Sequence, residues 1–233
     1  MATQYAFGKI VTNGLVLALD AADRNSYVSG STTWNDLSGN NYNGTLTFSG
    51  SGTIPSFNTG SLGFTSASFA YITFGNVLAL NSSSISGFVF GKLAKADSSY
   101  IPWIVKLASG GSYRLVSDSS NAIHFGIRDS ASVYQEITTT NNAISTGSWY
   151  YMGFTHDFTT NSGSIYVNGA LKVTGSFSVL RSDGNVNLNV GYNANNITFL
   201  SGEIASFQIY NRALTATEIT QNYNAQKSRF SLT

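Results

Sequence analysis

The chain has 233 residues, of which only 10% are charged, and its formal net charge is +1. This near-neutral balance, without a basic cluster, argues against electrostatic capture of nucleic acid or of an anionic membrane. Cysteine is absent, which excludes disulfides, thiolate chemistry and cysteine-based zinc sites.

Short apolar or alternating runs, separated by Gly, Ser, Asn and Asp, predict many β-strands. In the first part of the chain we expect strands at residues 14–20, from about 45, and at 62–64, 69–74, 84–95, 101–107, 113–116, 123–127 and 133–139. The runs at 62–64 and 69–74 are interpreted as the two strands of one hairpin. Residues 20–27 read as a turn, and a long polar loop begins at Trp34.

Residues 149–173 carry the clearest strand signal. Tyr150, Met152 and Phe154 alternate with small or polar residues, as a half-buried strand requires. Asn168 and Gly169 separate two apolar runs, and this dipeptide favours a type I′ turn because both positions need a positive φ. The stretch therefore predicts two or three antiparallel strands in series. Further strands are expected at residues 186–191 and 201–212.

A single helix is predicted near the C-terminus. Thr215 and Glu218 have the spacing of a capping box, in which the threonine is the N-cap residue. Leu214 and Ile219 flank this box as a hydrophobic staple. The tail at residues 227–233 is expected to fray or to dock on a neighbouring molecule.

The domain organisation follows from an even composition without internal repeats. We expect an N-terminal arm at residues 1–13, one domain at residues 14–226, and a C-terminal tail at residues 227–233. The close spacing of short strands is typical of an all-β fold, namely a two-sheet antiparallel jelly-roll β-sandwich, here with one short C-terminal helix.

Several motifs resemble laminin-G-like domains of the concanavalin A-like superfamily, over roughly residues 14–226. They are GLVLALD at 14–20, WNDLSGN at 34–40, WY at 149–150, YVNG at 166–169, and the run from Gly202 to Asn224. The closing run, residues 210–230, resembles versions found in tailed-phage structural proteins. The resemblance implies two sheets of about six or seven strands each, and a module that binds or displays glycans or proteins.

The sequence departs from this family at one point. Many relatives carry a pair of acidic residues just before the position of Tyr71, where this chain reads TSASFA at residues 65–70. Because calcium needs several carboxylate or carbonyl oxygens, we expect no calcium site there.

The acidic residues do not suggest an enzyme. Glycoside hydrolysis needs two carboxylates across the scissile bond, and no strand here carries two acids at alternating positions. Glu203 is the most plausible single acid, but it is interpreted as a strand-end carboxylate. His124 and His156 have no partner at metal-ligand spacing. We therefore expect no catalytic residues, no metal and no cofactor.

Aromatic and polar side chains in or beside loops are the remaining signal for ligand binding, since sugars stack on Trp and Tyr rings. The candidate ligand-binding residues are Trp103, Tyr42, Arg128, Tyr134, Tyr192 and Asn195. For Trp103, exposed contact and core packing are equally open. Trp34 and Trp149 are interpreted as packing residues.

The chain shows no apolar run of about 20 residues and no signal-peptide hydrophobic region, so neither membrane insertion nor export is expected. With the phage resemblance, this predicts a virion structural or decoration protein, made in the host cytoplasm and displayed on the capsid, neck or tail. Its partners would be other virion proteins and further copies of itself. The candidate contact residues are Tyr5, Phe7, Ile10, Arg229 and Phe230.

Three alternatives stay open at this point. The chain could be a carbohydrate-binding adhesin that recognises host-surface glycans. It could be a cytoplasmic protein, or an extracellular one whose signal has been removed. Least favoured is a glycoside hydrolase with an unusual arrangement of acids.

Overall fold

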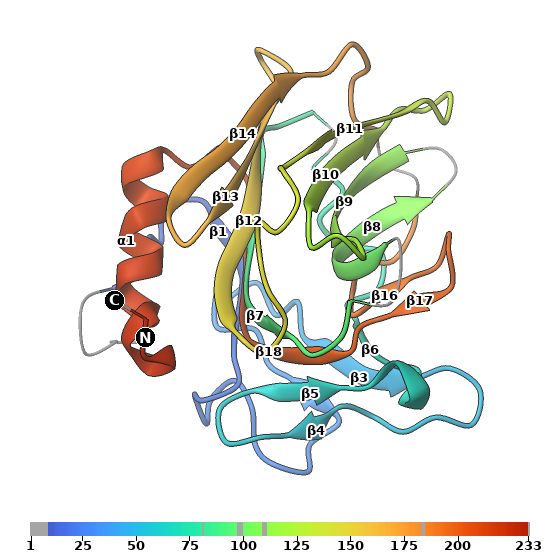
Figure 1. Ribbon diagram of the computed structural model, residues 1–233, viewed down its shortest axis with the longest axis vertical. Coiled ribbons are helices and arrows are strands. Elements are labelled where there is room, and N and C mark those ends of the chain that lie inside the picture. The colour runs from blue at the N-terminus through green and yellow to red at the C-terminus, as the bar shows by residue number, and fades with distance from the viewer. Residues whose placement is uncertain (1–8, 81, 97–99, 109–110, 183–184, 233) are drawn as a thin grey trace.

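A computed structural model describes residues 9–80, 82–96, 100–108, 111–182 and 185–232 (Figure 1). Two antiparallel β-sheets pack face to face, and one α-helix, α1 (Ala216–Gln226), lies outside them. The expected all-β jelly-roll sandwich with a short C-terminal helix is confirmed. No helix in the described ranges is long and apolar enough to cross a membrane.

Each sheet contains eight strands among the described residues, somewhat more than the resemblance implied, because an edge strand of only two residues, β4 or β2, is counted in each. The first sheet has the order β14 (Ala170–Ser176), β13 (Ser162–Val167), β12 (Trp149–Asp157), β7 (Ile85–Leu93), β18 (Gly202–Tyr210), β5 (Leu62–Phe64) and β4 (Ser56–Phe57), and β1 (Leu15–Asp20) also pairs with β18.

The second sheet has the order β11 (Tyr134–Thr138), β10 (Ile123–Arg128), β9 (Gly111–Ser117), β8 (Ile101–Ala108), β15 (Asn189–Val190), β6 (Ala70–Thr73), β3 (Gly44–Phe48) and β2 (Thr33–Trp34). A small separate hairpin, β16 (Tyr192–Asn193) and β17 (Thr198–Phe199), lies beside β8 and β6. Most strands expected from the sequence are present, although only two residues of 186–191 pair as a strand.

The predicted Asn-Gly hairpin joins β13 and β14. Asn168 has a φ of 51° and Gly169 a φ of 78°, so both central residues adopt the positive φ that a type I′ turn requires. Val167 pairs with Ala170 directly across the turn. The local sequence signal was sufficient here because the turn and its register are set by neighbouring residues.

The hairpin expected between residues 62–64 and 69–74 is wrong. β5 lies in the first sheet and β6 lies in the second, and the short 3₁₀-helix η1 (Ser66–Ser68) carries the chain between them. Phe69 follows with a φ of 51°, which redirects the backbone. Both strands bury every second side chain in the same core, one from each sheet. Their sequences therefore alternate in the way that the two strands of a hairpin would.

The helix begins as predicted. Thr215 Oγ1 accepts a hydrogen bond from the Glu218 backbone N–H at 3.3 Å, and the Glu218 carboxylate accepts one from the Thr215 N–H at 2.9 Å. Arg212 donates two further hydrogen bonds to this carboxylate, at 2.8 and 2.6 Å. Leu214 and Ile219 are both buried, as a hydrophobic staple requires.

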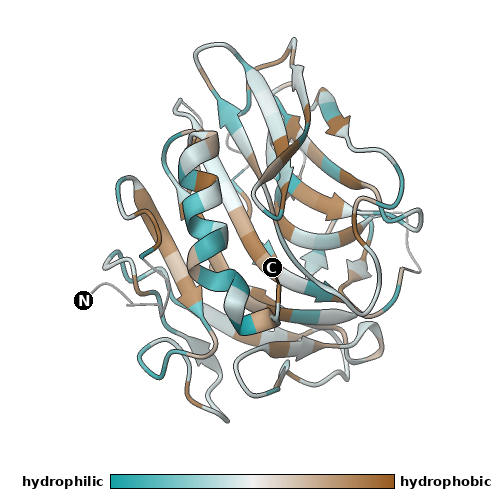
Figure 2. Cartoon of the chain, turned by 60° about the vertical axis from the view of Figure 1, so that its left-hand side comes forward, coloured by the Kyte–Doolittle hydropathy of each residue, from teal (hydrophilic) through white to brown (hydrophobic). Residues whose placement is uncertain are grey.

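The outer face of the first sheet is covered by α1, which lies across its strands (Figure 2). A second apolar cluster forms between them, and it includes Phe88, Phe90, Tyr151, Tyr210, Ile219 and Tyr223. No helix covers the outer face of the second sheet within the described part of the chain.

The C-terminal tail packs on its own domain, which corrects the expectation that it frays or docks on a neighbour. The 3₁₀-helix η2 (Lys227–Phe230) continues α1 directly. Arg229 donates hydrogen bonds to both carboxylate oxygens of Asp20, at 2.8 and 2.9 Å. The Phe230 ring stacks on Phe90 with centroids 4.1 Å apart. Both candidate contact residues therefore have partners within the chain.

The N-terminal segment also lies against the helix. Ile10 is only 7% exposed, and the backbone N–H of Val11 donates to Asn222 Oδ1 at 2.7 Å. Ile10 is therefore buried in this domain instead of being presented to a partner. Tyr5 and Phe7, the other two candidate contact residues, lie outside the described residues.

Candidate functional site

The second sheet directs alternate side chains of its strands to the uncovered face. On β6, Ile72 is fully buried in the core while Tyr71 and Thr73 point outward and are half-buried. On β15, Val190 lies in the core and Asn189 faces outward. In register, Asn189 lies between Thr73 on one side and Val105 of β8 on the other.

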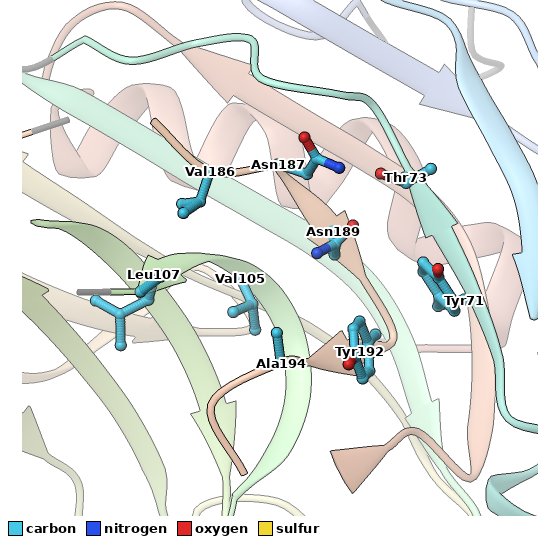
Figure 3. A pocket seen from close by; sticks show the side chains of 10 residues that line it. Tyr71, Thr73, Val105, Leu107, Val186, Asn187, Asn189, Tyr192 and Ala194 are labelled. Carbon is cyan, nitrogen blue, oxygen red and sulfur yellow. The ribbon is translucent and has the colours of Figure 1, made fainter. Parts of the chain in front are cut away.

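These outward side chains surround a hollow of about 400 Å³ (Figure 3). Its apolar part is formed by Val105 and Leu107 of β8. Its polar lining is Tyr71, Thr73, Asn187, Asn189 and Tyr192. Figure 3 shows Asn189 between the β8 residues and the two tyrosines, so polar and apolar groups face one space. Such a mixture is typical of sites for small, partly polar ligands.

The two tyrosines form one aromatic wall. The rings of Tyr71 and Tyr192 lie 4.8 Å apart at 37°, and Tyr192 also stacks on Phe199 at 4.8 Å and 22°. This packing fixes the ring positions before any ligand arrives. The described structure gives neither tyrosine hydroxyl a hydrogen-bond partner, so both can bond to a ligand.

Asn189 carries the most informative atom of the hollow. The residue is 8% exposed, and its Oδ1 is buried without a hydrogen-bond partner. An unpaired buried acceptor destabilises a fold by about 1–3 kcal/mol, so buried carbonyls are nearly always bonded. Because Asn189 lines the hollow, a ligand there that donates a hydrogen bond would satisfy this oxygen.

Of the candidate ligand-binding residues, Tyr192 is the one among the described lining residues of this hollow. Asn195 is not one of them, but its Nδ2 donates to the carbonyl of Leu107, a lining residue, at 3.0 Å. Tyr42 lies elsewhere: it precedes β3, packs against the core, and donates its backbone N–H to Asp36 at 3.2 Å.

Trp103 belongs to the core, so its assignment as an exposed ligand contact is wrong. It is fully buried, and its Nε1 donates to Ser117 Oγ at 3.0 Å. A β-bulge between Pro102 and Ile104 turns both Trp103 and Ile104 inward. Gly91 on the opposite sheet leaves room for the ring, since a Cβ there would lie 2.6 Å from it. Sequence spacing alone does not reveal a bulge.

Arg128 and Tyr134 lie on the same outer face but farther along the sheet. The Arg128 guanidinium lies 5.7 Å from the Tyr134 ring, and both border a charged cluster formed by Arg114, His124 and Glu136. The Arg114 Nε donates to the Tyr134 hydroxyl at 2.8 Å, and its Nη2 lies 3.4 Å from the Glu136 carboxylate. Their strands, β9 to β11, are separated from the hollow by the apolar residues of β8.

This charged cluster is internally satisfied. Burial raises the pKa of the Glu136 carboxyl, but hydrogen bonds from His124 and Tyr134 outweigh it and bring the pKa to about 2. Burial lowers the pKa of His124, yet the carboxylates of Glu136 and Asp118, 3.3 and 3.1 Å away, raise it above its usual value. Arg114 and Glu136 thus form an ion pair, and hydrogen bonds tie His124 to the carboxylates of Glu136 and Asp118. Among the described residues no group of three or more His, Asp or Glu is arranged to hold a metal ion.

Glu203, the most plausible single acid, occupies a structural position. Its carboxylate lies 2.6 Å from Lys92 Nζ and accepts a hydrogen bond from Ser61 at 2.6 Å. Burial raises its pKa, but these two partners outweigh burial and lower it. An ionised, paired carboxylate is a poor general acid near neutral pH.

A second hollow of about 630 Å³ is lined by other residues, including Tyr27 and Phe57. It is larger, but the Tyr27 hydroxyl already donates to the Ser31 carbonyl at 3.0 Å. None of its described lining residues has a buried polar atom without a partner. The hollow beside Asn189 is therefore the better candidate.

Sequence reasoning missed Tyr71, Thr73, Asn187 and Asn189. Their alternation with apolar residues was visible at residues 69–74 and 186–191 and placed polar side chains on one face of each run. What it did not reveal is that β15 inserts between β6 and β8, more than 80 residues away in sequence.

Comparison with known proteins agrees with this description. The family model of the "Concanavalin A-like lectin/glucanases superfamily" matches residues 66–220. A search of curated proteins finds no match.

Among solved structures, the binding domain of botulinum neurotoxin serotype D aligns with 18% identity and a TM-score of 0.69, over 93% of this chain and 53% of that one. The binding domain of Paraclostridial Mosquitocidal Protein 1 aligns with 18% identity and a TM-score of 0.66, over 92% of this chain and 52% of that one. The botulinum neurotoxin serotype D ligand binding domain in complex with N-acetylneuraminic acid aligns with 16% identity and a TM-score of 0.64, over 93% of this chain and 52% of that one.

This chain therefore spans about half the length of those chains. At such low identity the likeness concerns the fold, which in each case belongs to a domain described as binding. The family match covers well over half of the sequence and includes most of the run at residues 202–224, whereas the motifs at residues 14–40 lie outside it. The chain belongs to the concanavalin A-like lectin/glucanases superfamily.

Proposed function

We propose that this chain is a non-enzymatic glycan-binding domain and that its site is the hollow over β6, β8, β15 and β16. The observation that carries the proposal is Asn189 Oδ1, a buried acceptor without a partner on a residue that lines a hollow walled by two tyrosines. The superfamily is named for lectins and glucanases, and one solved structure of similar fold is described in complex with N-acetylneuraminic acid.

The chemistry of the hollow suits a sugar. One face of a pyranose ring is apolar and packs on Tyr, Val or Leu side chains, while its hydroxyls bond to amide and hydroxyl groups. Tyr71 and Tyr192 supply the aromatic surface, Val105 supplies an aliphatic one, and Asn187 and Asn189 supply amides. The paired state of Glu203 and of the charged cluster favours binding over hydrolysis.

A glycan array tests this proposal. The full chain should bind a subset of glycans saturably, and Tyr192→Ala should abolish the signal because it removes half of the aromatic wall. Phe57→Ala is the matched control, since this ring is 36% exposed but lies on β4, in the other sheet. Circular dichroism would establish that both variants fold. A flat array, or equal signals from wild type and Tyr192→Ala, would contradict the proposal.

A second candidate function is display on a phage particle, as a decoration or structural protein of the capsid, neck or tail. It is supported by the resemblance of residues 210–230 to tailed-phage structural proteins. An adhesin on a virion would combine both functions. Mass spectrometry of purified particles tests this role: many copies would indicate decoration and a few copies a fibre, whereas absence of the protein would refute it.

A further inference from the structure

We infer that the hollow binds an uncharged glycan, in which a hydroxyl or acetamido N–H donates a hydrogen bond to Asn189 Oδ1. The inference rests on the proposed function and adds the class of ligand. Sugars that carry a carboxylate, such as sialic or uronic acids, are disfavoured at this site.

The lining of the hollow carries no compensating charge. Its described residues are aromatic, aliphatic, amide or hydroxyl side chains, without Lys, Arg, His, Asp or Glu. A carboxylate moved from water into such a partly buried, neutral space loses hydration and gains no ionic partner. A neutral sugar loses much less hydration, because each hydroxyl can bond again to an amide or a tyrosine.

Lys106, which lies on β8 itself, is directed away from the hollow. The outward positions of this strand are Val105 and Leu107, so the alternating Lys106 points to the interior and is fully buried. There its Nζ donates to Asn76 Oδ1 at 2.8 Å and to the Val186 carbonyl at 2.6 Å.

The two arginines of this face also lie outside the hollow. Arg114 is 5% exposed, is paired with Glu136, and lies between the Tyr100 and Tyr134 rings at 4.2 and 4.6 Å. Arg128 is on β10, two strands from β8, where it lies over Tyr134. An anionic sugar held by Arg128 would therefore occupy a different part of the sheet.

Asn189 Oδ1 requires a hydrogen-bond donor on the ligand. A carbonyl oxygen only accepts, so the ligand atom that meets it must donate. Hydroxyls and acetamido N–H groups donate, whereas a carboxylate placed there would bring two acceptors together. The strand register fixes the backbone of Asn189 between Thr73 and Val105 before binding.

The test is an array of matched pairs, in which each neutral glycan is printed beside its sialylated or uronic-acid counterpart. The full chain and two variants, Asn189→Leu and Arg128→Gln, are compared at about 0.05 M and about 0.5 M NaCl. We expect signal on neutral members at both salt concentrations. It should weaken about tenfold or more in Asn189→Leu, through loss of the hydrogen bond, and stay unchanged in Arg128→Gln.

The other outcomes separate this inference from the proposed function. Preference for the acidic members, with loss in Arg128→Gln or in high salt, would overturn the inference while leaving glycan binding intact. Neutral binding that survives Asn189→Leu would overturn the assigned contact. Absence of signal on both members of every pair would overturn the proposed function and the inference together.

Discussion

His156 provides a prediction that the structure makes quantitative. It is fully buried on β12, where its Nε2 lies 2.9 Å from Asn161 Oδ1 and its Nδ1 has no partner. Burial is the main cause that lowers its pKa, to about 4, and a hydrogen bond with Asn161 offsets this only in part. The side chain is therefore neutral in the folded protein over the physiological range.

The consequence for stability follows from proton linkage. Between about pH 6.5 and pH 4 the unfolded chain binds a proton at this position that the folded chain does not. The free energy of unfolding therefore falls as the pH falls through this window. Lowering the pKa from 6.5 to about 4, at about 1.4 kcal/mol per pH unit, corresponds to roughly 3.5 kcal/mol when the whole window is crossed.

Urea unfolding of wild type and His156→Gln at about pH 7 and pH 4.5 measures this effect. Wild type should lose about 2–3 kcal/mol more than the variant between the two pH values. His124→Gln is the matched control, because it removes the only other histidine and leaves His156 in place. Equal losses in wild type and His156→Gln, or a wild type that gains stability on acidification relative to this variant, would refute the reasoning.

Three further predictions follow from named contacts. His124 has a raised folded pKa, so its stabilising charge is present below about pH 6.5 and lost as the pH rises through the folded value; urea titrations of wild type and His124→Gln should converge at alkaline pH. Asn189→Leu should raise the free energy of unfolding by about 1 kcal/mol, because it removes an unpaired buried acceptor; a loss of stability in calorimetry would contradict this. Phe230→Ala should lower it by about 1–2 kcal/mol, through lost stacking on Phe90, and an unchanged melting temperature would show that the tail is not docked.

Features that depend on neighbouring residues were predictable from the sequence. The turn at Asn168 and Gly169 and the capping box at Thr215 and Glu218 are set within a few residues, and the structure confirms both. The alternation on β12 likewise reported a strand correctly, but the strand is not half-buried as predicted: α1 covers its outer face, so both faces are buried.

Features that depend on distant pairing were not predictable in the same way. Residues 62–74 show the alternation of a hairpin but divide between two sheets. A strand in either sheet buries every second side chain in the shared core, so the alternation does not reveal which sheet a strand joins. Trp103 is turned inward by a bulge that its neighbours do not signal. The hollow needs β6, β8 and β15 to lie side by side, so only its individual polar residues were visible in the sequence.

The central claim is that a glycan occupies the hollow beside Asn189, and a crystal structure of the full chain with the best-binding array glycan tests it most directly. The account predicts a sugar ring packed against the wall of Tyr71 and Tyr192, with a donor group within about 3.2 Å of Asn189 Oδ1. A glycan bound elsewhere, for example in the hollow beside Tyr27 and Phe57 or over Arg128, with the space beside Asn189 empty, would contradict it.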